Sequence, residues 1–290
     1  MSNRFLYLVT VLIWGSTWLA IEYQLGVVVP EVSIVYRYAI ASFVLFIYCF
    51  YKKLPVVFKL KSHLWFALLG AFLFGLNYVF AYRAQVHITS ALAAIVFSMM
   101  LWINIVLSRV VFGTRAGRQV LFGAVLGIAG IIVLFAPQIR VLSLSDSVLY
   151  GSLLALLGAL MASTGNMVSQ GAQQRNLPVL QANAWGMLYG ALLTAMICAV
   201  RGYEFTFDAT FTYIASLLYL AVFGSVIAFG AYLTLLGRIG AHRAGYATVM
   251  FPVVALLLSI LFEGLRLDFG ILLGTALVLL GNVLVLKERS

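Results

Sequence analysis

Long apolar segments separated by short polar ones dominate the pattern of the chain. Ten segments are long enough to cross a bilayer as α-helices, at residues 5–22, 33–51, 64–83, 88–112, 119–136, 148–172, 180–200, 210–236, 243–262 and 269–286. A membrane helix needs about 20 mainly apolar residues. The segments are continuously apolar and do not alternate in polarity, which predicts helices rather than the strands of a β-barrel. We therefore predict an all-α polytopic membrane protein with ten transmembrane helices.

A polar linker at residues 137–147 divides the ten segments into two groups of five. Because five is odd, the second group must enter the membrane from the side opposite to the first. The two groups are then related as inverted five-helix repeats, an arrangement found in many secondary transporters. Within a single membrane domain, repeat one covers about residues 5–136 and repeat two about 148–286.

Short sequence matches between the two halves support an internal duplication. The offset between matching positions drifts slowly, from 148 to 150 to 151 residues. The matches pair Pro30 with Pro178, Ala81-Tyr82 with Ala231-Tyr232, and Ala93-Ala94 with Ala244-Gly245. Self-similarity at a nearly constant offset is the sequence signature of repeated structural units.

Composition and charge agree with a membrane protein and argue against a nucleic-acid partner. Hydrophobic residues make up 64% of the chain and charged residues 9%, against about 25% charged residues in soluble domains. The net charge is +10, but the basic residues lie in short loops at the ends of the apolar segments. With the N-terminus inside, thirteen Lys and Arg residues flank the inner side and four the outer side. This distribution predicts that both termini are cytoplasmic.

Three stretches form a recognisable set: residues 13–17 (Ile-Trp-Gly-Ser-Thr) in the first segment, Arg37 early in the second, and residues 244–263 with Pro252 inside them. They resemble the opening motif, the second-helix arginine and the ninth helix of EamA-type members of the drug/metabolite transporter superfamily. The resemblance covers essentially the whole chain and implies export of amino acids or other small metabolites across the bacterial inner membrane. One departure is Leu101, where the repeat alignment expects a second proline.

Aromatic and polar side chains recur at helical spacing within the apolar segments and are candidates for the lining of a solute cavity. Amide side chains in hydrocarbon need partners, so they face protein or a wet cavity. The candidates are Trp14, Tyr78, Tyr82, Ser98, Trp102, Asn166, Trp185, Tyr232 and Tyr246. The alternative is that these side chains only pack helices together, and the two readings stay open.

Four titratable residues are expected near the outer membrane edge. Arg37 could hold a carboxylate through its forked guanidinium, but we favour a structural role in which it reaches outward or pairs with Glu22 or Glu31. Glu22, Glu263 and His87 are the plausible proton carriers. Whether transport is coupled to protons stays open.

Pro252 and two groups of glycines predict features of helix geometry. A proline within a helix leaves the carbonyl four residues earlier, here that of Thr248, without its donor. The resulting kink is either a static bend or a hinge, and we favour the hinge slightly. Small residues on one face of a helix allow close packing in membranes. We expect such packing for Gly123, Gly127 and Gly130 in the fifth segment and for Gly274 and Gly281 in the tenth.

Several chemical motifs are absent from the sequence. There is no Walker A loop, no His-Glu-x-x-His pattern and no Gly-x-Ser-x-Gly elbow. We therefore expect no metal, no cofactor and no enzymatic activity. The chain is read as a secondary transporter that works by alternating access, with a small solute and the lipid bilayer as partners, as a monomer or weak homodimer. A passive channel and an intramembrane enzyme are the alternatives.

Overall fold

The computed structural model describes residues 1–134, 136, 146–254 and 269–287. In these ranges all regular secondary structure is helical, with no strand. Before the linker the elements are α1 Asn3–Glu22, α2 Pro30–Tyr51, α3 Leu60–Leu69, the π-helical η1 Gly70–Leu76, α4 Asn77–Gln85, α5 Ser90–Phe97, α6 Met100–Phe112 and α7 Arg118–Leu134.

After the linker, helical segments again follow one another closely. They are α9 Asp146–Gln174, α10 Val179–Val200, α11 Phe211–Tyr219, the π-helical η2 Leu220–Ile227, α12 Ala228–Ile239, α13 Ala241–Ala244, the 3₁₀-helical η3 Gly245–Met250 and α15 Phe269–Lys287. Of the first eight predicted segments and the tenth, all but the fourth correspond to a helix or a continuous run of helical segments, and the fourth corresponds to α5 and α6 with a break at residues 98–99. The ninth is described only as far as Val254, and the rest of it lies outside the described residues.

Seven helices in the described ranges are long and apolar enough to cross a membrane. They are Asn3–Glu22, Pro30–Tyr51, Leu60–Gln85, Leu92–Phe112, Asp146–Gln174, Val179–Val200 and Phe211–Ile239. Two shorter apolar helices, Arg118–Leu134 and Phe269–Val285, accompany them. For the residues that the structure describes, the expectation of helices long and apolar enough to span a membrane is therefore confirmed.

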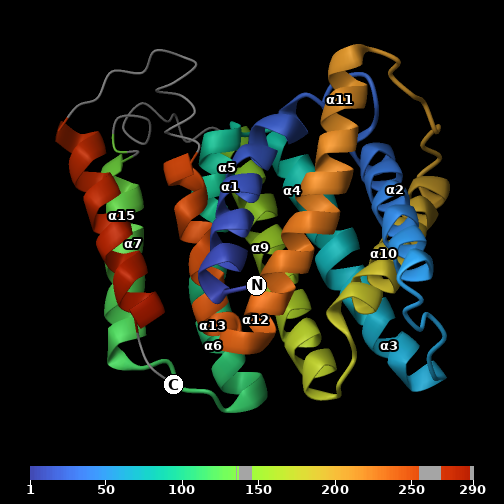
Figure 1. The fold of residues 1–290 in the computed structure, drawn as a ribbon. Coiled ribbons are helices and arrows are strands. Elements are labelled where there is room, and N and C mark those ends of the chain that lie inside the picture. The colour runs from blue at the N-terminus through green and yellow to red at the C-terminus, as the bar shows by residue number, and fades with distance from the viewer. Residues whose placement is uncertain (135, 137–145, 255–268, 288–290) are drawn as a thin grey trace.

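The helices run alongside one another, and the connections between them alternate between the two ends of the bundle (Figure 1). The links α2–α3, α6–α7, α9–α10 and α12–α13 lie at the lower end, and the links α1–α2, α4–α5 and α10–α11 at the upper end. Arg238, at the lower end of α12, donates hydrogen bonds to the Met1 carbonyl and to Asn3. The N-terminus therefore lies at the lower end as well.

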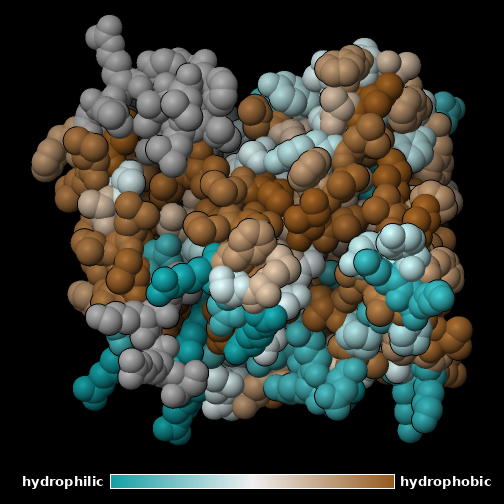
Figure 2. All heavy atoms as spheres, in the orientation of Figure 1, coloured by the Kyte–Doolittle hydropathy of each residue, from teal (hydrophilic) through white to brown (hydrophobic). Residues whose placement is uncertain are grey.

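Hydrophobic and hydrophilic residues separate along the bundle axis. Figure 2 shows hydrophobic residues across the middle of the face turned to the viewer and hydrophilic residues gathered in its lower part. Leu8, Leu12 and Phe43, all on helices that could span a membrane, are 57%, 59% and 66% exposed. Such an apolar flank suits contact with lipid tails.

The helices α7 and α15 form a closely packed pair at one side of the bundle (Figure 1). A Cβ atom added at Gly123 would lie 2.7 Å from the carbonyl oxygen of Gly281, and one at Gly130 would lie 2.7 Å from that of Gly274. Only glycine lets these two backbones approach so closely. The predicted close packing of the fifth and tenth segments is confirmed.

Departures from α-helical geometry occur at matching places in the two halves. The π-helical segment η1 begins at Gly70 and η2 begins at Leu220, an offset of 150 residues. The same offset relates Ala81-Tyr82 to Ala231-Tyr232 in the sequence. The break between α5 and α6 at residues 98–99 lies 151 positions before residues 249–250 in η3. Non-α segments often mark functional sites.

The region before Pro252 explains how the chain accommodates a proline there. In an α-helix the Thr248 carbonyl would accept a hydrogen bond from residue 252, and proline has no N–H to donate. Instead the N–H of Phe251 donates to the Thr248 carbonyl. This shorter bond belongs to the 3₁₀ geometry of η3. The vacant acceptor expected from the sequence is therefore satisfied by a tighter turn.

Candidate functional site

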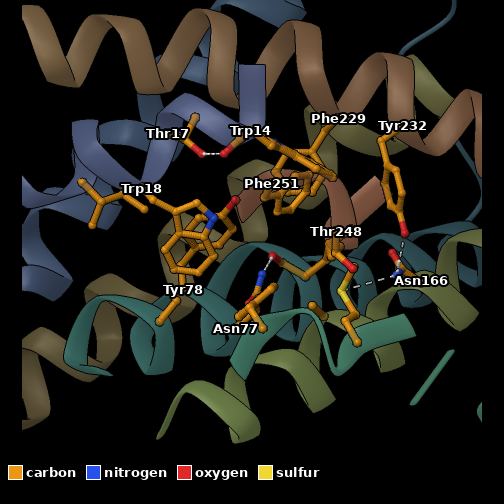
Figure 3. A pocket seen from close by; sticks show the side chains of 16 residues that line it. Trp14, Thr17, Trp18, Asn77, Tyr78, Asn166, Phe229, Tyr232, Thr248 and Phe251 are labelled. Atoms are coloured by element: carbon orange, nitrogen blue, oxygen red, sulfur yellow. Dashed lines mark hydrogen bonds between the residues drawn. The ribbon is translucent and has the colours of Figure 1, made fainter. Parts of the chain in front are cut away.

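Figure 3 shows a cavity lined by aromatic, aliphatic and a few polar side chains. Its volume is about 50 Å³. The lining residues of the first half are Trp14, Thr17, Trp18, Ile21, Leu73, Asn77, Tyr78, Ala81, Phe97 and Met100. Those of the second half are Ala162, Asn166, Phe229, Tyr232, Thr248 and Phe251. Both sequence repeats therefore build the cavity.

Trp14 of α1 joins the aromatic walls of the two halves. Its ring centroid lies 4.7 Å from that of Phe229, 4.8 Å from that of Tyr232 and 5.8 Å from that of Phe251. Its indole Nε1 donates a hydrogen bond of 3.0 Å to the Gly224 carbonyl in η2. Edge-to-face ring contacts and a satisfied N–H hold this tryptophan in one orientation.

Two buried amides give the cavity its polar character. Asn166 donates through Nδ2 to the Tyr232 hydroxyl at 3.0 Å and to Asn104 Oδ1 at 3.3 Å, and Asn77 donates through Nδ2 to the Leu73 carbonyl at 3.1 Å. The Oδ1 atoms of Asn77 and Asn166 are buried and accept no hydrogen bond. An unpaired buried acceptor costs free energy, so each oxygen favours a donor entering the cavity.

Arg37 of α2 lies beside this cavity and is fully buried. Its Nε donates to Ser225 Oγ at 2.9 Å, while Nη1 and Nη2 reach the hydroxyls of Tyr82 and Tyr78 at 3.4 Å each. Its guanidinium carbon lies 4.5 Å from the centroid of the Tyr78 ring. All of these contacts are to neutral groups.

The expectation that Arg37 reaches outward or pairs with Glu22 or Glu31 is wrong, because its side chain is buried and its partners are Ser225, Tyr78 and Tyr82. Glu31 instead receives two hydrogen bonds from Arg83, at 2.7 and 3.1 Å, and Glu22 is exposed. The position of Arg37 in the sequence indicates its depth along α2 but not the face it occupies, and that face is turned into the bundle.

The other two residues expected at the edge have different outcomes. His87 is half-buried, with Nδ1 3.3 Å from Ser147 Oγ and its ring packed against Tyr150. Glu263 lies outside the described residues.

Four of the nine residues expected to line a cavity do so: Trp14, Tyr78, Asn166 and Tyr232. Tyr82 lies behind Tyr78, in contact with Arg37. Ser98 donates to the Ile95 carbonyl at the end of α5, and Trp102 packs at the edge of the core.

Trp185 and Tyr246 also lie away from the cavity. Trp185 packs against Phe46 and His63, and its Nε1 donates to the Val56 carbonyl in the loop between α2 and α3. The Tyr246 hydroxyl lies within hydrogen-bond distance of two carbonyls, 3.3 Å from that of Gly123 in α7 and 3.1 Å from that of Val278 in α15. Helical spacing identified faces that are buried, but burial against another helix and burial against a cavity have the same sequence pattern.

Sequence reasoning missed much of the lining, including Phe97, Met100, Thr248 and Phe251. The repeat offset was a usable signal for these four. At 151 residues, Phe97 matches Thr248 and Met100 matches Phe251, and all four line the cavity. In these two pairs, residues at equivalent positions of the two repeats line the same cavity.

A helical bundle with an apolar flank and a cavity built by both halves has the architecture of a membrane transporter. The EamA-like transporter family matches residues 2–136 and again residues 149–287. The chain therefore belongs to the EamA-like transporter family and is an integral membrane protein.

Curated relatives are similar along most of the chain. The uncharacterized transporter YoaV of Bacillus subtilis is 26% identical over 93% of this chain and 91% of its own length. A probable amino-acid metabolite efflux pump of Salmonella typhimurium is 25% identical over 97% and 93%. The uncharacterized inner membrane transporter YedA of Escherichia coli is 27% identical over 86% and 78%.

A solved crystal structure has the same fold. It covers 100% of this chain and 99% of its own, with a TM-score of 0.79 and 19% sequence identity. The names of the family and of these relatives are those of transporters rather than of enzymes.

Proposed function

We propose that this protein is a secondary transporter that exports amino acids or similar small metabolites across the bacterial inner membrane by alternating access. In this proposal ten helices span the membrane as two inverted five-helix repeats, joined by the linker at 137–147. The cavity around Trp14 is the solute site. The protein works as a monomer or weak homodimer within the lipid bilayer.

The observation that carries the proposal is the shared construction of the cavity. Its lining comes from both matched repeats, and it includes residues of η1 and η3, where the helices depart from α geometry. Secondary transporters bind solute at the interface of their repeats, commonly at interrupted helices. A cavity placed there is exposed to one side or the other when the repeats rock against each other.

The size of the cavity supports a conformational cycle. A cavity volume of about 50 Å³ is room for a few water molecules, which is less than an amino acid needs. The aromatic rings around Trp14 must therefore separate when solute enters. The structure corresponds in this proposal to a contracted state of the cycle, and η1 and η2 are matched segments at which the repeats bend.

Orientation and direction rest on charge and on relatives. Thirteen Lys and Arg residues flank the apolar segments on the side of the N-terminus, against four on the other side, and the positive-inside rule assigns the richer side to the cytoplasm. One relative is named an amino-acid metabolite efflux pump and another an inner membrane transporter. These names support export across the inner membrane by this chain.

The test is a flux assay in proteoliposomes with a panel of amino acids, run with and without a pH gradient. A carrier exchanges labelled for unlabelled solute faster than it moves solute one way, so preloading the vesicles should speed the entry of label. A passive channel shows no such acceleration, and flux without it would contradict the proposal. The pH gradient reports whether protons are coupled.

Trp14→Ala locates the solute site in the same assay. Loss of one aromatic contact is worth about 1 kcal/mol, so we expect the apparent affinity for solute to fall about fivefold. Trp65→Phe is the control, because Trp65 packs against Arg175 outside the cavity and a ring is retained. Wild-type kinetics in Trp14→Ala would place the solute site elsewhere.

A further inference from the structure

The buried guanidinium of Arg37 has no acidic partner among the residues that the structure describes. Its contacts are Ser225, Tyr78, Tyr82 and the ring of Tyr38, all of them neutral. In the described part of the chain the ion pair is that of Arg83 with Glu31. Burying a charge without a counter-charge is costly. Such a buried cation either helps to specify a unique fold or binds an anionic ligand.

The two terminal nitrogens of Arg37, Nη1 and Nη2, make only long hydrogen bonds. Nε has a good bond of 2.9 Å to Ser225 Oγ, which fixes the side chain to η2. Nη1 and Nη2 carry four of the five N–H donors, yet each has a single contact of 3.4 Å. These two nitrogens form the edge that binds a carboxylate through two parallel hydrogen bonds.

This edge lies next to the solute cavity. Tyr78 lines the cavity and also lies over the guanidinium, with its ring centroid 4.5 Å away. A second approach passes Gly224 of η2. A Cβ atom there would lie 3.0 Å from Cγ2 of Thr17, which lines the cavity, and 3.3 Å from Arg37 Nη2. Tyr78 and Gly224 are therefore the two places at which the guanidinium and the cavity lining come close to each other.

We propose that Arg37 binds the carboxylate of the transported solute, with Tyr78 as the ring that covers and uncovers it. This deepens the proposed function and rests on it. The unpaired oxygens of Asn77 and Asn166 supply acceptors for an ammonium group inside the cavity, and the rings around Trp14 suit an apolar side chain. The class of solute is then a zwitterionic α-amino acid with an apolar or aromatic side chain.

The experiment compares L-phenylalanine with L-phenylalaninamide, which keeps the ring and the ammonium but lacks the carboxylate. We expect wild-type protein in proteoliposomes to prefer phenylalanine. Arg37→Gln should lower the ratio of phenylalanine to phenylalaninamide transport by about tenfold, the factor that 1.4 kcal/mol represents. The ratio is independent of the amount of folded protein.

Two variants serve as controls. Arg83→Gln removes a guanidinium that is paired with Glu31 outside the cavity, and it should leave the ratio unchanged. Arg37→Lys keeps the charge but loses the fork, so it should lower the ratio less than Arg37→Gln does. It also keeps the test usable if Arg37→Gln fails to fold.

Gly224→Ala tests the approach to Arg37 from the other side. Its methyl group would stand between Thr17 and Arg37 and should reduce phenylalanine transport more than phenylalaninamide transport. Gly230→Ala is the matched control, because a Cβ atom there has nothing within 4 Å.

A thermal melt separates a binding role from a structural one. Because the guanidinium is buried without a counter-charge, Arg37→Gln should melt at the wild-type temperature or higher. Phenylalanine should raise the melting temperature of the wild type and not that of Arg37→Gln. A lower melting temperature with an unchanged transport ratio would show that Arg37 only supports the fold and would overturn the inference.

The inference and the proposed function fail in different ways. If the wild type moves phenylalaninamide as well as phenylalanine, transport stands and carboxylate recognition is wrong. If the wild type moves no member of the amino-acid panel, the proposed function itself is wrong.

Discussion

At the scale of single residues, the cavity combines side chains whose polar atoms are satisfied with others whose polar atoms are not. Trp14 donates its N–H to the Gly224 carbonyl, and the Tyr232 hydroxyl accepts from Asn166. Asn77 and Asn166 each keep a buried oxygen without a donor. These unmatched acceptors favour a ligand group that donates hydrogen bonds.

Asn166→Ala tests how much the polar network holds the bundle together. The change removes the donor to the Tyr232 hydroxyl, which is buried, and to Asn104 Oδ1. Interhelical hydrogen bonds in membrane proteins are worth about 0.6 to 2 kcal/mol. We expect the free energy of unfolding in detergent to fall by about this amount.

The matched control is Thr164→Ala on the same helix. Thr164 donates only to the Leu160 carbonyl of its own turn, so this change should leave the unfolding free energy nearly unaltered. Equal stability of the two variants would mean that the Asn166 network contributes nothing.

At the scale of elements, interrupted helices concentrate around the cavity. Thr248 belongs to η3, Leu73 to η1, and Phe97 ends α5. The 3₁₀ turn before Pro252 determines which way Thr248 and Phe251 point, because a 3₁₀ helix has 3.0 residues per turn rather than 3.6. The geometry of this short segment is therefore part of the site.

Pro252→Ala tests whether that segment acts as a hinge. The new N–H would compete with that of Phe251 for the Thr248 carbonyl and favour α geometry. Thr248 and Phe251 would then rotate relative to the cavity. We expect solute turnover to fall severalfold while the protein remains folded and binds solute, measured by flux and by thermal melting in detergent.

The alternative readings of Pro252 have different outcomes. A static bend predicts that melting temperature and transport fall together, because a straightened helix misfits the bundle. Wild-type turnover together with wild-type stability would contradict both the hinge and the static bend.

At the scale of the whole molecule, the connections alternate between two ends, and the end that holds the N-terminus is the more hydrophilic one (Figures 1 and 2). The helices α7 and α15 form a glycine-packed pair beside the helices that enclose the cavity. This division separates a part of the fold held by close backbone packing from the part that lines the cavity.

Cysteine labelling tests the proposed orientation. The two native cysteines, Cys49 and Cys198, are fully buried and should not react. Thr206→Cys, in the exposed α10–α11 link, should react with an impermeant thiol reagent added to intact cells. Val57→Cys, at a position 88% exposed at the opposite end, should react only after the cells are opened. The reverse pattern would place the termini outside.

The sequence by itself determined the helical class, the positions of the long helices, the duplication and the close packing of two glycine-bearing helices. These follow from local properties: the length of an apolar run, the drift of a repeat offset and the size of a side chain. Family resemblance added the transporter class, which the match over residues 2–136 and 149–287 bears out.

Only the tertiary structure decided which buried faces meet a cavity. Tyr78 and Tyr82 are one turn apart on the same helix, yet Tyr78 lines the cavity and Tyr82 lies behind it. Arg37 could not be placed because its partners Ser225 and Tyr82 are 188 and 45 residues away in the chain. The hydrophobicity of a helix face predicts that the face is buried. Which residues or cavity it contacts depends on how segments distant in the sequence pack against it.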